Sequence, residues 1–192
     1  MKNKKVRVNA ERFFVPHAML LSAAHQALER GKLGGDGYWY DWLNVMLCCS
    51  LSVEAVANAY GESFVENWRD FDSSSPLAKI RLVAEKGGIH VDFSKHPWST
   101  VPSLIKFRNR VAHAKPEDVS SESFHHPDHY LKEMYAMPQS KLERMVSEST
   151  ARRSLDDIYE ILGVLRTAFP VEKVNKIEIG WWTTGASLMD SE

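Results

Sequence analysis

The chain has 192 residues, which suits one domain with a sizeable hydrophobic core. Hydrophobic residues make up 44% and charged residues 26%, a composition that excludes a disordered or fibrous protein. The net charge of −1 also excludes a chain that is basic throughout, so any contact with nucleic acid must be local. No apolar run approaches the ~20 residues of a membrane helix, and we expect no membrane span.

The cysteines and the start of the chain bear on its compartment. Cys48 and Cys49 are adjacent in an apolar run, where they cannot form an ordinary disulfide and are expected to be buried thiols. The basic first residues resemble the start of a signal peptide, but Pro16, His17 and His25 interrupt the apolar stretch that should follow. We therefore expect no export and a cytoplasmic location.

Apolar residues at helical spacing predict four helices before residue 116. A helix over 18–28 stops at a glycine-rich connection, and a long, buried central helix over 38–60 is expected to end at Gly61. A third helix starts at Ser75-Pro76, which resembles an N-cap followed by proline at the first helical position. A fourth runs over 100–114 and carries the most informative residues of the chain.

The second half is predicted to hold a long connection, one long helix and a tail. Residues 116–140 are polar and read as a surface loop with one short helix around 130–135. Leu142 to Phe169 has helical spacing and stops at Pro170, and residues 176–181 alternate like a strand that needs a partner, for example another subunit. These elements predict a single domain over 1–192: an all-α bundle of about five main helices, with a core over about 12–169 and an extended tail over 170–192.

Three residues near the end of the fourth helix can hold a phosphate and move a proton: Arg108, Asn109 and His113. On a helix Asn109 and His113 share a face, while Arg108 lies ~140° around the axis from His113. Two copies of this helix crossing at a twofold axis would bring two arginines and two histidines around one cleft. The motif therefore predicts a homodimer if it predicts catalysis.

Three stretches, residues 51–58, 76–85 and 107–113, resemble the HEPN superfamily of all-α domains. Many of its members are metal-independent ribonucleases in toxin, abortive-infection and CRISPR-associated defence systems. The catalytic pattern of that superfamily is arginine, a polar residue, three more positions and histidine, and Arg108, Asn109 and His113 match it. Arg12 and His17 repeat the spacing but fail the pattern, because Phe13 follows the arginine.

The resemblance implies RNA cleavage by attack of a ribose 2′-hydroxyl, without metal or cofactor. His113 would be the general acid/base, Arg108 the phosphate clamp, and Asn109 the group that orients either the histidine or the scissile phosphate. An antitoxin partner would fit a toxin–antitoxin setting. Three further basic residues could bind the substrate by adding local positive charge: Lys106, Arg110 and Lys115.

Other interpretations of the same residues stay open. Arg108 could pair with a buried Glu54, and His113 could cap helix-end carbonyls, which would make both structural. A catalytically inactive HEPN-type module that binds a nucleotide, RNA or a protein partner is the main alternative function. The histidines in 125–129 invite a metal site, but Pro127 interrupts them and a surface loop is the favoured interpretation.

Overall fold

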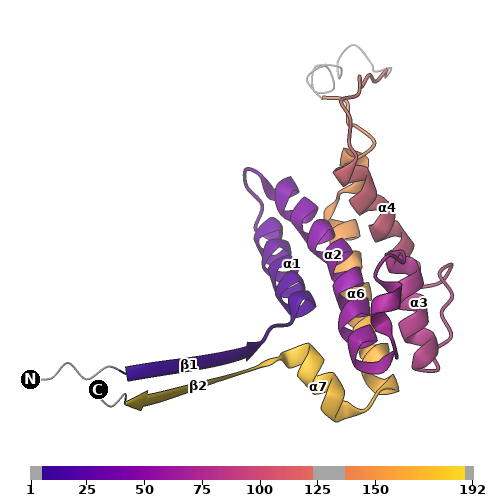
Figure 1. The fold of residues 1–192 in the computed structure, drawn as a ribbon. Coiled ribbons are helices and arrows are strands. Elements are labelled where there is room, and N and C mark those ends of the chain that lie inside the picture. The colour runs from indigo at the N-terminus through magenta and orange to yellow at the C-terminus, as the bar shows by residue number, and fades with distance from the viewer. Residues whose placement is uncertain (1–5, 123–136, 189–192) are drawn as a thin grey trace, which may run out of the picture.

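The computed structural model describes residues 6–122 and 137–188, and it is mostly helical with one small two-stranded sheet (Figure 1). The predicted helical bundle is therefore confirmed at the level of fold class. The short helix expected around 130–135 and the histidines in 125–129 lie outside the described residues. The described helices are α1 (Pro16–Lys32), α2 (Tyr38–Phe64), η1 (Trp68–Phe71), α3 (Pro76–Lys86), α4 (Thr100–Ala112), η2 (Glu143–Met145), α6 (Glu148–Ala168) and α7 (Val171–Ile179).

Helix α2 is the central element, and it packs against α1, α3, α4 and α6. The expectation that Gly61 ends this helix was wrong, since the helix continues to Phe64. Gly61 is there because the Trp68 ring lies against the helix: a Cβ atom on Gly61 would sit 2.3 Å from Trp68 Cδ2. The glycine thus makes room for a tryptophan and does not act as a stop signal.

The length and composition of α2 would also allow a membrane span, with a mean hydropathy of 1.3 over its most apolar window. However, 44% of that window is buried inside the bundle. Core positions such as Val45, Cys49 and Val53 face the other helices. Packing thus accounts for a large part of the apolar surface of α2, as in the core helix of a bundle.

The last long helix begins later than predicted. Residues 143–145 form the short η2, and α6 begins at Glu148 after a capping box at Ser147. The Ser147 hydroxyl accepts a hydrogen bond from the Thr150 amide at 3.2 Å, and the Thr150 hydroxyl accepts one from the Ser147 amide at 2.9 Å. This reciprocal cap satisfies amide groups at the helix start, which fixes the boundary.

The strand-like interpretation was wrong for residues 176–179, because they belong to another helix, α7, which follows Pro170 in the tail that was expected to be extended. Val174 and Ile177, three residues apart, are both buried in the core, which alternation alone does not reveal. Glu178 fastens α7 to the bundle by accepting hydrogen bonds from the Tyr60 hydroxyl at 2.6 Å and from Arg166 Nε at 2.8 Å. The core therefore extends beyond residue 169.

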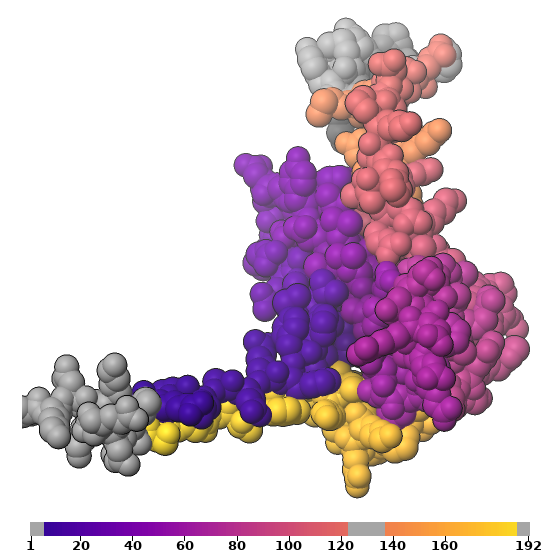
Figure 2. Space-filling model, in the orientation of Figure 1, coloured from indigo at the N-terminus to yellow at the C-terminus, as the bar shows by residue number. Residues whose placement is uncertain are grey.

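A strand does follow α7, and its partner is in the same chain. Strand β2 (Trp181–Leu188) pairs antiparallel with β1 (Val6–Phe13), from Phe13 opposite Trp181 to Val6 opposite Leu188. Figures 1 and 2 show this pair projecting from the bundle as a narrow arm, away from α4. The pair β1–β2 is called the arm below. The N-terminal strand was not predicted, because its partner is more than 160 residues away.

Candidate functional site

The candidate site lies at the C-terminal half of α4, whose orientation is set by its apolar face. Val101, Leu104 and Phe107 are buried at spacings of three, and they hold α4 against the bundle. The opposite side of the helix carries exposed polar residues, among them Asn109. Arg108 lies at the edge between these faces, with 26% of its side chain exposed.

Arg108 is held in place by acceptors on two elements. Its Nη1 donates a hydrogen bond to Glu54 Oε2 on α2 at 3.2 Å. Its Nε and Nη2 donate to Oδ1 of the neighbouring Asn109 at 3.3 and 3.1 Å. The pairing of Arg108 with Glu54, anticipated as a structural alternative, is therefore present. It orients the guanidinium group at the surface.

Glu54 joins three helices, because it also accepts a hydrogen bond from Lys79 of α3. The distance from Lys79 Nζ to Glu54 Oε1 is 3.1 Å, and only 4% of the Lys79 side chain is exposed. Glu54 itself is not fully buried as supposed, since 33% of its side chain is exposed. The carboxylate thus neutralises a buried ammonium group and, at its open side, holds Arg108.

His113 lies just past the end of α4 rather than on it. It is the C-cap residue, and its backbone N–H donates to the Asn109 carbonyl at 3.0 Å, while its side chain is exposed. The carbonyl is thus capped by the backbone of His113, which leaves the imidazole free to meet a ligand. His113 lies five positions after Arg108, and no hydrogen bond joins the two side chains among the described residues.

The predicted substrate-binding residues surround this end of α4 on more than one side. Lys106, Arg110 and Lys115 are all exposed. Arg110 Nη1 lies 3.6 Å from Met145 Sδ of η2, whereas Arg108 turns toward α2. Arg108 and Arg110 are two positions apart on the helix, which places their side chains ~200° apart around its axis. The structure therefore brings Arg108 together with Asn109 but not with Arg110. The positive charge encircles the helix end.

A second charged cluster, which the sequence interpretation missed, lies at the other end of α4. His96 Nε2 is 2.6 Å from Asp157 Oδ1 of α6, and the Thr100 hydroxyl donates to Asp157 Oδ2. Asp157 is buried, with 3% of its side chain exposed, while His96 is 60% exposed. The sequence did offer one signal for this cluster. Asp157 lies on the buried face of α6 with Ser154 and Ile158, and a buried carboxylate must have hydrogen-bond partners.

This cluster borders a hollow of about 720 Å³, but its charges do not favour an anionic substrate. The arginines of the hollow, Arg152 and Arg153, are outnumbered by carboxylates, and Arg152 is already paired with Glu148 at 2.6 Å. A second carboxylate, Glu160, lies 3.7 Å from His96. We interpret the cluster as a clasp that ties the start of α4 and the preceding loop to α6.

Neither clusters of metal-binding side chains nor comparisons with known proteins identify a function for the described residues. Within residues 6–122 and 137–188, no group of three or more His, Cys, Asp or Glu side chains could hold a metal ion. The chain matched no protein-family model, no curated protein and no solved structure. The likeness to the HEPN superfamily therefore stays a prediction, carried by residues 51–58, 76–85 and 107–113.

Proposed function

We propose that the chain is a metal-independent endoribonuclease of the HEPN type, with its catalytic groups at the C-terminal end of α4. One observation carries the proposal. In a chain of net charge −1, residues 100–115 contain four Lys or Arg residues and one histidine but no Asp or Glu, and this helix end is exposed around a pre-oriented arginine. Such a local excess of positive charge is what a phosphate backbone requires.

The reaction we propose is transesterification followed by release of the leaving strand. The His113 imidazole takes the proton of the ribose 2′-hydroxyl, and the 2′-oxygen forms a bond to phosphorus while the bond to the 5′-oxygen breaks. An imidazolium returns a proton to the departing 5′-oxygen, giving a 2′,3′-cyclic phosphate and a 5′-hydroxyl. Arg108 donates hydrogen bonds to the non-bridging oxygens, where negative charge builds up.

A homodimer would supply the two proton-transfer groups that this reaction needs. One helix end supplies a single histidine, and its Arg108 is held by Glu54 and Asn109, so we propose that two α4 ends meet at a twofold axis and that each cleft uses groups from both chains. The setting we propose is a cytoplasmic defence or toxin–antitoxin system, where RNA is the target and an antitoxin could be the partner.

Incubation with RNA in EDTA tests the proposal, with cleavage ends mapped for 2′,3′-cyclic phosphate. We expect cleavage by the wild type and at least a hundredfold loss in His113→Ala, since general acid/base groups contribute ~10²–10⁴-fold. The matched control is His90→Ala, another exposed histidine, which should cleave normally. Equal cleavage by wild type and His113→Ala would remove His113 from the mechanism.

The second candidate function is a catalytically inactive module that binds RNA, a nucleotide or a protein partner. It is favoured by the engagement of the whole Arg108 fork, because Nη1 is taken by Glu54 and both Nε and Nη2 by Asn109. A folded protein that binds RNA in a salt-dependent manner, without turnover, would establish this function. In that case Lys106→Ala and Lys115→Ala should each weaken binding and reduce the salt dependence.

A further inference from the structure

The arm carries an apolar face that the bundle does not cover. Side chains on a strand alternate, and paired residues share a face, so Val6, Val8 and Ala10 lie on the same side as Trp182 and Ala186. All five are exposed, Val8 by 68% and Trp182 by 71%. Thr184 and Arg12 share this side, and the exposed apolar residues gathered there mark an interaction surface.

The arm is also too small to be a finished sheet. Only β1 and β2 form it in the described part of the chain, and it stands clear of the helices (Figures 1 and 2). An isolated two-stranded ribbon is at best marginally stable in water, whereas three or more strands with a hydrophobic face can be stable. The unpaired edge of β1 presents backbone N–H and C=O groups to which another strand can bind.

The charges on β1 match a second copy of β1. Arg7 and Glu11 share the polar face with Asn9 midway between them, and they are too far apart, about 13 Å, to pair with each other. Within the arm their opposite residues on β2 are the neutral Ser187 and Thr183. Two β1 strands paired antiparallel about Asn9 would place each Arg7 opposite Glu11 of the partner subunit.

We propose that the arm is a homodimerisation element in which β1 pairs antiparallel with β1 of a second copy, centred on Asn9, to give a four-stranded sheet. This register keeps the apolar residues Val6, Val8 and Ala10 of both chains on one face, because residues of the same parity become neighbours. A shift by one residue would set Arg7 opposite Arg12 and mix the two faces. The register is therefore specified by both charge and polarity.

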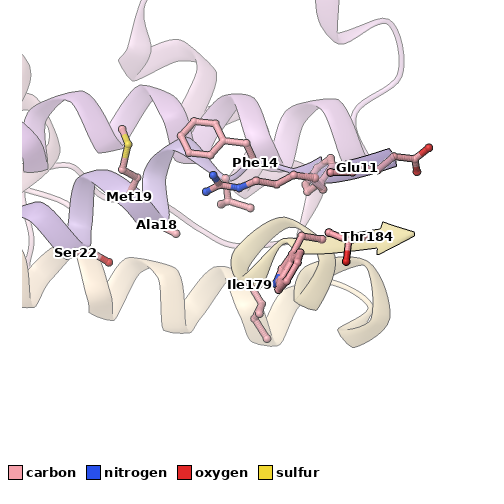
Figure 3. A pocket seen from close by; sticks show the side chains of 12 residues that line it. Glu11, Phe14, Ala18, Met19, Ser22, Ile179 and Thr184 are labelled. Carbon is pink, nitrogen blue, oxygen red and sulfur yellow. The ribbon is translucent and has the colours of Figure 1, made fainter. Parts of the chain in front are cut away.

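The base of the arm offers a place for the tip of the partner's arm. A hollow of about 860 Å³ lies there, and Figure 3 shows Phe14, Ala18 and Met19 on one side of it and Ile179 on the other. Arg12 also lines this hollow, and in the proposed register it would be the neighbour of the partner's Val6. The exposed valine of each tip would thus lie beside the hollow of the other chain, whose lining includes apolar residues such as Phe14 and Met19.

The arm interface is independent of the ribonuclease proposal, because the arm and α4 lie on different sides of the bundle (Figure 1). If both surfaces are twofold interfaces, the chains join into assemblies larger than a dimer. Disruption of the arm should then leave the dimer held by α4, whereas it should leave a monomer where the arm is the only interface. RNA cleavage is measured separately, so a failure of one proposal leaves the other standing.

Charge reversal on β1, followed by sedimentation or light scattering, tests the arm. Arg7→Glu and Glu11→Arg each place two like-charged pairs across the twofold axis, and we expect a dissociation constant raised by about tenfold or more and a particle of lower mass than the wild type. The double variant Arg7→Glu/Glu11→Arg, and a mixture of the two single variants, should both recover the wild-type mass. Glu172→Arg, an exposed charge reversal on α7, is the control that should change nothing.

Disulfide formation tests the register directly. Asn9→Cys faces itself across the proposed axis and should form a disulfide-linked dimer under mild oxidation, whereas Ala10→Cys alone should not. Mixing Ala10→Cys with Val8→Cys should restore the cross-link, since these positions are opposite each other. A monomeric wild type, or an assembly whose mass and cross-links ignore all changes on β1, would overturn the proposal.

Discussion

The two ends of α4 carry similar groups in opposite surroundings. At the N-terminal end His96 and Thr100 bind a buried carboxylate, Asp157, whereas at the C-terminal end Arg108 is held by the half-exposed Glu54 and His113 is open to solvent. Charge pairs that are buried are costly to break, while exposed pairs contribute little to stability and leave the groups available to a ligand. We therefore expect the first end to contribute to stability, and the second end is the one we propose for ligand binding.

Removal of the buried carboxylate should have the largest effect on stability. Asp157→Ala deprives His96 and Thr100 of their common acceptor, and with ~1.5–3 kcal/mol for each hydrogen bond to a charged group we expect a loss of about 3 kcal/mol. Denaturant unfolding measures it, and the exposed neighbour Asp156→Ala is the control, within ~0.5 kcal/mol of wild type. Equal stability of the two variants would contradict the role of Asp157 as a clasp.

Glu54→Gln should have a smaller effect, which arises from α3 rather than from Arg108. The amide leaves the buried Lys79 ammonium without its counter-charge, and we expect a loss of about 2 kcal/mol. In the double variant Glu54→Gln/Lys79→Met most of this loss should be recovered, because no buried charge is left unpaired. If Lys79→Met does not compensate, the cost of Glu54→Gln lies in its contact with Arg108, contrary to the low value expected for an exposed pair.

The comparison also shows what the sequence could and could not predict. The four helices before residue 116 followed from apolar spacing, and the cap at Ser75 and the start of α4 at Thr100 were correct, since these signals are local. Gly61 was misread because its reason is a tryptophan seven residues away, which local patterns do not show. The β1–β2 pairing was missed because it joins the two ends of the chain.

For the candidate site, the sequence could suggest residues, but it could not predict most of the contacts between distant side chains. Arg108 and Asn109 are adjacent, so their contact was within reach, and the pairing of Arg108 with Glu54 was anticipated as an alternative. The clasp was not anticipated, because His96 and Asp157 are 61 residues apart and their meeting depends on how α4 packs against α6. Long-range contacts of this kind are decided by tertiary packing, which periodicity does not encode.

A buried histidine, His17, tests whether buried ionisable groups affect stability more than exposed ones do. His17 is buried at the start of α1, and burial lowers its pKa below the ordinary 6.5, with Glu178 opposing that shift. Below pH 6.5 the unfolded chain therefore binds a proton that the folded chain does not, and stability should fall with pH until the folded His17 is itself protonated. His17→Leu should lose this part of the pH dependence in denaturant unfolding, whereas the exposed His25→Leu should keep it.

The smallest effect on stability is expected for the histidine of the proposed active site, and this prediction decides between the two ends of α4. His113→Ala removes an exposed side chain beyond the helix end and should change the free energy of unfolding by no more than ~0.5 kcal/mol, while RNA cleavage is lost. The same substitution at His96 should give the reverse: lower stability, because Asp157 loses a partner, with cleavage retained in the folded protein. If instead cleavage depended on His96 and survived His113→Ala, the clasp would be the catalytic centre, because a histidine oriented by a buried carboxylate is also a suitable general base.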